Sequence, residues 1–216
     1  MKFNLLHNAK KSKLLLFFNG WGMDDTLFDH FAQSDFDVMT VSDYNSLEPL
    51  PELQNYSELH LAAWSLGVRV AAEFLGNAPY KFETATAFNG TLRPLDADFG
   101  IAPEIFAGTA KNWNNELARN RFYRRVAENS PFQLPQRDWE SQQSELFFLG
   151  KHFLAKTPPN PFKTAWIGGR DRIIPAKNQR DFWAKESVKI KEYAEEPHFP
   201  FDKINSFEEI IHVGRN

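Results

Sequence analysis

The chain has 216 residues, of which 42% are hydrophobic, and a formal net charge of −3. That length suits one α/β domain with an insertion, and the slightly negative charge gives no general attraction for nucleic acid or an anionic membrane. Because the chain has no cysteine, disulfides, thiolate nucleophiles and thiolate metal sites are excluded.

Export and membrane signals are not expected. The opening residues, MKFNLLHNAKKSK, include no apolar stretch of signal-peptide length. The densest apolar run, LLLFF at 14–18, is far shorter than the roughly 20 residues that a membrane span needs. These features predict a soluble cytoplasmic protein.

Strand-like and helical segments alternate over the first ninety residues. Apolar runs predict strands at 13–20, 36–44, 58–64 and 82–90. Helical spacing predicts one helix at 23–33, which Asp24 or Asp25 could cap, and another after Ser65, which Gly76 would end. This alternation favours a mostly parallel sheet with helices on both faces.

The alternation stops after Pro94, and the following text is helical and polar. It predicts a helical lid inserted at about 100–158. The α/β pattern then resumes with strands within 162–175 and at 187–193 and helices around 176–186 and at 201–214. We therefore expect one α/β domain over residues 1–216.

The segment A-W-S-L-G at 63–67 lies where the strand at 58–64 gives way to a helix. It differs from the G-x-S-x-G nucleophile elbow only at Ala63, which is still small. Small residues on both sides of the serine keep the backbones from colliding, and the serine oxygen then projects at the positive end of the helix. We favour Ser65 as a nucleophile; the alternative is that it only caps the helix.

A nucleophilic serine needs a base, and the base needs an acid to orient it. In α/β-hydrolases the three residues follow in the order Ser, Asp, His. Asp171 follows a predicted strand and two glycines, although it could instead cap the next helix, and His198 follows the next predicted strand. His212 falls inside or at the end of the last helix, where a histidine more often serves the negative terminus. The order predicts Asp171 as the acid and His198 as the base, rather than an ordinary loop histidine.

Chemistry at Ser65 would also need two fixed N–H groups beside the developing oxyanion. The candidates are the amide of Leu66, which follows the nucleophile, and the amide of Trp21 in the loop NGWGMD. Gly20 and Gly22 would let this loop approach a substrate closely, although an ordinary glycine-rich turn has the same composition.

Five segments, FFNGWGMDD, AWSLGVRVA, FNGTLRP, IGGRDRIIP and EEPHFPF, together resemble the BioG type of pimeloyl-[acyl-carrier protein] methyl ester esterase. The likeness runs nearly end to end. It implies an α/β-hydrolase with a helical lid and a triad of Ser65, Asp171 and His198, with Trp21 and Leu66 at the oxyanion. In that family the enzyme hydrolyses the methyl ester of pimeloyl-acyl carrier protein in biotin synthesis and releases methanol.

The predicted lid is basic although the whole chain is not. Residues 111–125 hold five basic residues against one acidic residue, and in a helix Arg121 lies one turn from Arg124 and Arg125. Guanidinium groups suit carboxylates and phosphates, so the cluster could dock the acidic acyl carrier protein; a solvated helix face would look the same. Phe122 and Tyr123 could line the acyl passage or pack the lid onto the core.

These features predict a serine carboxylesterase of the α/β-hydrolase-like class that acts through an acyl-enzyme and needs no metal or organic cofactor. Its partner would be the acyl carrier protein that carries the pimeloyl methyl ester, with no nucleic acid and no membrane involved. One departure from the commoner hydrolase pattern is Asn19, where many relatives carry histidine. The alternatives are a serine esterase or thioesterase of other substrate range and a hydrolase-like binding protein with a dead site.

Overall fold

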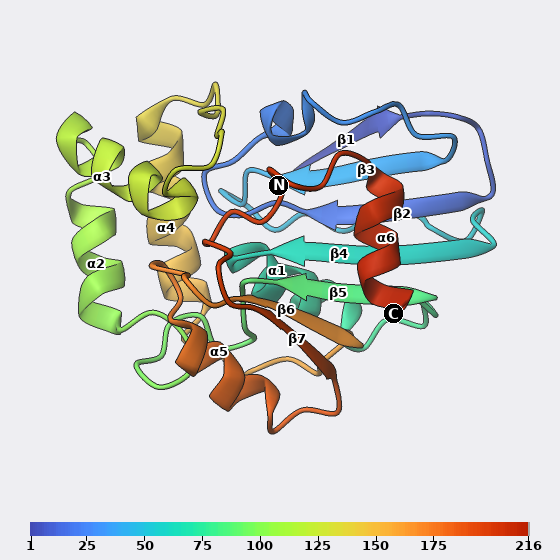
Figure 1. Cartoon of the computed structure of the whole chain (residues 1–216). Coiled ribbons are helices and arrows are strands. Elements are labelled where there is room, and N and C mark those ends of the chain that lie inside the picture. Colours follow the sequence, from blue (N-terminus) through green and yellow to red (C-terminus); the bar gives the residue numbers. More distant parts are fainter. Residues whose placement is uncertain (216) are drawn as a thin grey trace.

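The computed structural model describes residues 1–215, so Asn216, the last residue of the expected domain, lies outside the described residues. Within that range seven strands form one sheet in the order β1-β3-β2-β4-β5-β6-β7 (Figure 1). The strands are β1 (Lys2–His7), β2 (Lys13–Phe18), β3 (Asp37–Ser42), β4 (Glu58–Trp64), β5 (Thr84–Phe88), β6 (Thr164–Gly168) and β7 (Lys189–Tyr193). β1 pairs antiparallel with β3, and the other pairings are parallel. The expected mostly parallel α/β architecture is confirmed.

Helices cover both faces of this sheet, as Figure 1 shows for α6 in front of the strands and α1 behind them. The helical elements are the 3₁₀ turn η1 (Asp25–Phe28), α1 (Leu66–Leu75), α2 (Pro103–Lys111), α3 (Glu116–Ala127), α4 (Trp139–His152), α5 (Ala176–Trp183) and α6 (Phe207–Arg215). None of the helices within residues 1–215 has the length and apolar character needed to cross a bilayer.

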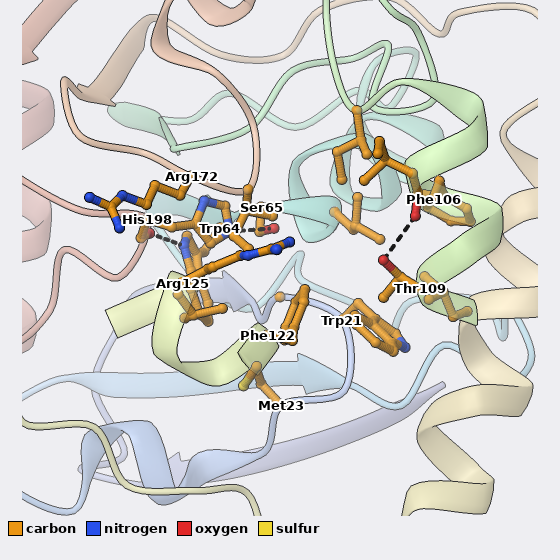
Figure 2. A pocket seen from close by; sticks show the side chains of 17 residues that line it. Trp21, Met23, Trp64, Ser65, Phe106, Thr109, Phe122, Arg125, Arg172 and His198 are labelled. Carbon is orange, nitrogen blue, oxygen red and sulfur yellow. Dashed lines mark hydrogen bonds between the residues drawn. The ribbon is translucent and has the colours of Figure 1, made fainter. Parts of the chain in front are cut away.

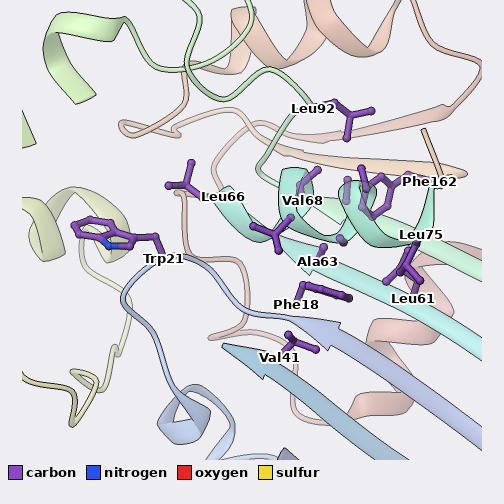
Figure 3. Close-up of a cluster of buried hydrophobic side chains, with 14 of the residues drawn as sticks. Phe18, Trp21, Val41, Leu61, Ala63, Leu66, Val68, Leu75, Leu92 and Phe162 are labelled. Atoms are coloured by element: carbon purple, nitrogen blue, oxygen red, sulfur yellow. The ribbon is translucent and has the colours of Figure 1, made fainter. Parts of the chain in front are cut away.

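Alternate residues of each central strand pack into two separate hydrophobic cores, one on each face of the sheet. On β2, Leu14, Leu16 and Phe18 pack into a cluster shared with α1, α5 and the inner side of the lid, part of which Figure 3 shows. Leu15 and Phe17 point to the opposite face and pack with α6. The continuous apolar text LLLFF therefore reflects a strand that is buried on both faces, as a central parallel strand must be.

The inserted helices α2, α3 and α4 lie together beyond the carboxyl ends of β4 and β5 (Figure 1). Their bounds, 103–152, fall within the expected lid at about 100–158. Phe106 of α2 and Leu146 and Leu149 of α4 are buried in the core cluster that holds α1. The lid is thus anchored by apolar packing at the edge of the sheet where active sites of open parallel sheets lie.

The helix expected at 23–33 is wrong, because only the four residues of η1 are helical there. Asp24 caps this turn by accepting from the backbone and the hydroxyl of Thr26. Past the turn the Ala32 amide donates to Asn205 instead of continuing a helix, because the segment before α6 lies alongside. The helical spacing of Phe28 and its neighbours instead serves packing against α6.

One strand was missed, and one helix begins later than expected. The edge strand β1 was not predicted, since KFNLLH has no buried residue and its pairing with β3 depends on a distant segment. The last helix begins at Phe207 rather than near 201, because Phe201 and Ile204 are core residues of the extended segment that precedes it. Gly76 does end α1, where a Cβ would lie 2.2 Å from the Pro159 carbonyl.

A buried ion pair also holds α4 to the sheet. The Glu145 carboxylate accepts from the Tyr44 amide at 3.1 Å and from Arg137 at 2.5 Å, and Arg137 also donates to Asp43 at 3.0 Å. Glu145 is fully buried, and desolvation raises its pKa to about 7 despite the opposing effect of Arg137. This carboxyl therefore takes up a proton in the folded protein at a pH where it is ionised in the unfolded chain.

We expect Glu145 to make stability fall as pH rises. Between about pH 4.5 and 7 the native carboxyl binds a proton that the unfolded chain has released, so the free energy of unfolding decreases across this window. The free energy of unfolding of Glu145→Gln minus that of wild type should therefore increase between pH 5 and pH 7.5, by about 3 kcal/mol at most. Urea unfolding at both pH values checks this, with Glu140→Gln on the exposed face of α4 as the control. If the difference in unfolding free energy between wild type and Glu145→Gln is the same at both pH values, the prediction is wrong.

Candidate active site

Ser65 occupies the sharp turn between β4 and α1. Its backbone has φ 56° and ψ −127°, a left-handed conformation that is strained for a residue with a side chain. The Ser65 amide donates to the Phe88 carbonyl of β5 at 2.9 Å, which fixes the turn to the sheet. The side chain makes no capping bond to α1, so the interpretation of Ser65 as a simple helix cap is wrong.

Small residues around the turn let three backbones meet. A Cβ on Gly67 would lie 2.2 Å from the Asn19 carbonyl, in the loop that follows β2. A Cβ on Gly90 would lie 2.4 Å from the Ser65 carbonyl. Both distances are far below ordinary contact, so the glycine two residues after Ser65 is required by close packing of α1 against the loop after β2.

The structure brings the three predicted side chains into one hydrogen-bonded chain, of which Figure 2 shows Ser65 and His198. The Ser65 hydroxyl lies 2.9 Å from His198 Nε2, and His198 Nδ1 lies 2.7 Å from Asp171 Oδ2. All three residues are buried. Since Asp171 accepts from Nδ1–H, Nε2 is left free to accept the proton of the serine hydroxyl.

Asp171 is itself held from two sides. Its Oδ1 accepts from the amides of Ile173 and Ile174 at 2.8 and 2.9 Å, and its Oδ2 also accepts from Gln179 Nε2 at 2.8 Å. The two amides belong to the turn before α5, whose cap residue is Pro175, so Asp171 does not cap that helix. Gln179 is fully buried and was not anticipated; its position on the first turns of α5 gives no sequence signal for the contact.

The loop that carries His198 is fixed by two side chains that the sequence analysis missed. Asn89, just after β5, donates to the carbonyls of Pro197 and His198 at 3.0 and 2.9 Å and accepts from the Gly168 amide at 2.6 Å. Trp64 Nε1 donates to the same His198 carbonyl at 2.8 Å. Strands β4 and β5 therefore position the imidazole through its backbone.

Trp21 and Leu66, the expected oxyanion residues, both line the cavity beside Ser65. Leu66 is the first residue of α1, so its amide has no acceptor inside the helix. The Trp21 amide likewise donates to no acceptor within residues 1–215. Two backbone N–H groups are thus left unused near the serine hydroxyl.

A cavity of about 610 Å³, including its open mouth, lies over Ser65 between the sheet edge and the lid. Its wall is mostly apolar, with Ile105 and Phe106 from α2, Phe122 from α3 and Leu146 from α4. Figure 2 shows Phe122 and Trp21 on one side of this space, and Arg125 and Arg172 on the side near His198. An apolar wall with guanidinium groups beside it suits an aliphatic chain with a charged group at one end.

The basic lid residues divide into two groups. Arg125 lines the cavity, whereas Arg121 and Arg124 do not. All three are exposed on α3, and none has an ion pair with another residue in the described range. Tyr123 is hydrogen-bonded to the lid residue Gln142 and does not line the cavity.

Within residues 1–215, no group of three or more His, Asp or Glu side chains is placed to hold a metal ion.

Comparison of sequences places this chain beside one family over nearly its whole length. A sequence model described as pimeloyl-ACP methyl esterase BioG matches residues 1–210. A protein from Bacteroides fragilis named malonyl-[acyl-carrier protein] O-methyltransferase is 37% identical over 192 residues, which is 85% of this chain but only 39% of that protein. A protein from Haemophilus influenzae of uncharacterized function is 34% identical over 179 residues, covering 79% of this chain and 82% of that protein.

Comparison of structures agrees. BioG from Haemophilus influenzae superposes with a TM-score of 0.87 at 28% identity, covering 98% of this chain and all of that chain. A thermophilic esterase from Thermogutta terrifontis superposes with a TM-score of 0.66 at 13% identity, covering 99% and 91%. The second likeness supports the fold alone, which is that of the α/β-hydrolases.

We expect Asn89→Ala to lower the free energy of unfolding by about 2–4 kcal/mol. The change leaves the buried Gly168 amide and the Pro197 carbonyl without partners, and each such group costs about 1–3 kcal/mol. Urea unfolding measures the loss. Asn178→Ala is the matched control, since its amide also donates to two carbonyls but lies partly exposed on α5. Equal losses in the two variants would contradict the special role of Asn89.

Proposed function

We propose that this chain, which belongs to the BioG family of pimeloyl-ACP methyl esterases, is a serine esterase that cleaves the methyl ester of pimeloyl-acyl carrier protein. The observation that carries the proposal is the hydrogen-bonded chain from Ser65 through His198 to Asp171, which opens into an apolar cavity under the lid. The product would be the free ω-carboxylate, still attached to its carrier.

The first half of the reaction forms an acyl-enzyme. His198 Nε2 takes the hydroxyl proton as Ser65 Oγ attacks the ester carbonyl. The amides of Trp21 and Leu66 stabilise the oxyanion of the tetrahedral intermediate, an effect that is typically the largest single contribution in such sites. His198 then returns the proton to the departing methoxide, and methanol leaves.

The second half releases the acid. A water molecule gives a proton to His198 Nε2 and attacks the acyl-enzyme carbonyl. Collapse of the second tetrahedral intermediate breaks the bond to Ser65 Oγ, which recovers the proton from His198. Asp171 keeps the imidazole oriented and stabilises its cationic form throughout.

The relatives support a methyl ester on a carrier as the substrate. The chain spans about two fifths of the Bacteroides fragilis relative, whose name assigns it methyl transfer to malonyl-acyl carrier protein. Methylation of a carrier-bound carboxylate creates the bond that this esterase would later break. The apolar cavity suits the aliphatic chain between that ester and the carrier.

The carrier would dock at the mouth of the cavity. Arg121 and Arg124 stand exposed on α3 without ion pairs to described residues, and Arg125 beside them reaches the cavity itself. An acyl carrier protein is acidic, so these guanidinium groups offer charge complementarity and bidentate donors for carboxylate or phosphate. With the carrier held there, its acyl chain would enter past Arg125 and Phe122 toward Ser65.

Ser65→Ala should abolish hydrolysis of the carrier-bound methyl ester. Loss of the nucleophile is expected to lower turnover at least about 10,000-fold, because the remaining groups provide no attacking oxygen. A fluorophosphonate probe should label the wild-type chain and the control Ser144→Ala, and leave Ser65→Ala unlabelled. If the wild-type chain is not labelled, or Ser65→Ala keeps normal turnover, the proposed mechanism is wrong.

The double variant Arg121→Glu/Arg124→Glu should affect carrier-bound substrate only. We expect KM for the carrier-bound methyl ester to rise about tenfold or more at low salt, since two attractive charges become repulsive. Hydrolysis of a free short-chain aryl ester should not change. Lys81→Glu reverses one positive charge on an exposed loop at the other end of the sheet and serves as the control for a change of charge away from the lid. An equal response of the two substrates would refute carrier docking while leaving the esterase reaction in place.

A further inference from the structure

Gln142 of α4 is a buried side chain whose polar atoms all have partners. Only 2% of the residue is exposed. Its Nε2 donates to the Gly22 carbonyl at 2.9 Å and to the Tyr123 hydroxyl at 3.1 Å, and its Oε1 accepts from Trp113 Nε1 at 2.9 Å. The backbone carbonyl of Gln142 accepts from Trp21 Nε1 at 2.7 Å. The side chain and the carbonyl of Gln142, which does not line the cavity, therefore take part in these four hydrogen bonds, two of them with the loop after β2.

These bonds fix the loop after β2 at Trp21 and at the residue that follows it. The indole of Trp21 is held by the α4 backbone, and the Gly22 carbonyl is held by the Gln142 side chain. Gly22 has φ +74°, and a Cβ there would lie 3.5 Å from Gln142 Cγ. Glycine has more accessible backbone angles than other residues, so a hydrogen bond to its carbonyl restricts the turn further. Gln142 thus limits rotation of the segment that carries the Trp21 amide.

We propose that Gln142 is a positioning residue that keeps the Trp21 amide aimed at the oxyanion. The inference rests on the proposed function, and it makes the lid a part of the oxyanion hole as well as the wall of the cavity. Oxyanion donors act only when they are preorganised at the position where charge develops. A loop that turned away would still bind substrate but would stabilise the transition state less.

The same side chain connects the other lid elements to the loop. Trp113 lies between α2 and α3, Tyr123 lies on α3, and both contact Gln142. The Trp113 ring also packs against Trp21 with centroids 4.4 Å apart. A movement of α3 therefore reaches the Trp21 segment through bonded side chains as well as ring contacts.

The test compares Gln142→Met with Gln143→Met. Methionine at 142 keeps the volume and removes the bonds to Gly22, Tyr123 and Trp113. Gln143 is the next residue of α4, and its Nε2 donates to the carbonyl of the lid residue Ala110 at 2.8 Å; its side chain has no hydrogen bond to the loop after β2 within residues 1–215. Two substrates are used, the carrier-bound methyl ester and p-nitrophenyl acetate, which is too short to need the lid wall.

We expect Gln142→Met to lower kcat about 10- to 100-fold on both substrates with little change in KM. Its affinity for a phenylboronic acid, which forms a tetrahedral adduct with the serine, should fall by a similar factor. Gln143→Met should stay within about twofold of wild type in every measurement.

The inference is overturned if kcat and boronate affinity of Gln142→Met stay at the wild-type level, or if only KM rises, which would assign Gln142 to lid packing. Gln142→Asn, which keeps an amide but shortens its reach, is measured in the same way and is decisive if the methionine variant does not fold. Absence of activity in the wild-type chain on both esters would instead refute the proposed function.

Discussion

The site depends on the left-handed backbone of Ser65. A residue with a side chain adopts such a conformation at a cost of about 1–3 kcal/mol, so the surroundings must hold it. The bond from its amide to Phe88 and the close packing of Gly67 and Gly90 do so. Because of this turn the hydroxyl is directed away from α1 and toward His198, rather than into a cap. Relaxation of the turn would separate Ser65 from His198, the two groups on which the proposed hydrolysis relies.

Helix α4 holds the loop after β2 at both of its ends. Gln142 binds Gly22 at the far end of the loop, and Glu145, almost one turn further on, binds the Tyr44 amide. The Tyr44 hydroxyl in turn donates to the Asn19 carbonyl at 2.7 Å, at the start of the loop. A single lid helix thus supports the segment proposed to bind the oxyanion from both directions. The lid cannot shift as a rigid cover without disturbing these bonds.

Local patterns were sufficient to predict three residues that the structure joins in one hydrogen-bonded chain, and insufficient to find the residues that hold them in place. The small residues around Ser65 and the order of Asp171 and His198 are visible in the sequence, because each follows a strand in the same way. Asn89 and Gln142 bond partners 108 and 120 residues away, and only the assembled sheet and lid bring them together. The false helix at 23–33 and the missed β1 have the same cause, since distant segments determine both.

The most direct test of the account is the intact mass of a pimeloyl methyl ester carried on acyl carrier protein, measured before and after incubation with the wild-type chain. Cleavage of the ester predicts that the carrier loses the mass of one methylene group and keeps the acyl chain, as methanol is released. Loss of the entire acyl group would show a thioesterase and contradict the assignment, and an unchanged mass would contradict catalysis on this substrate altogether.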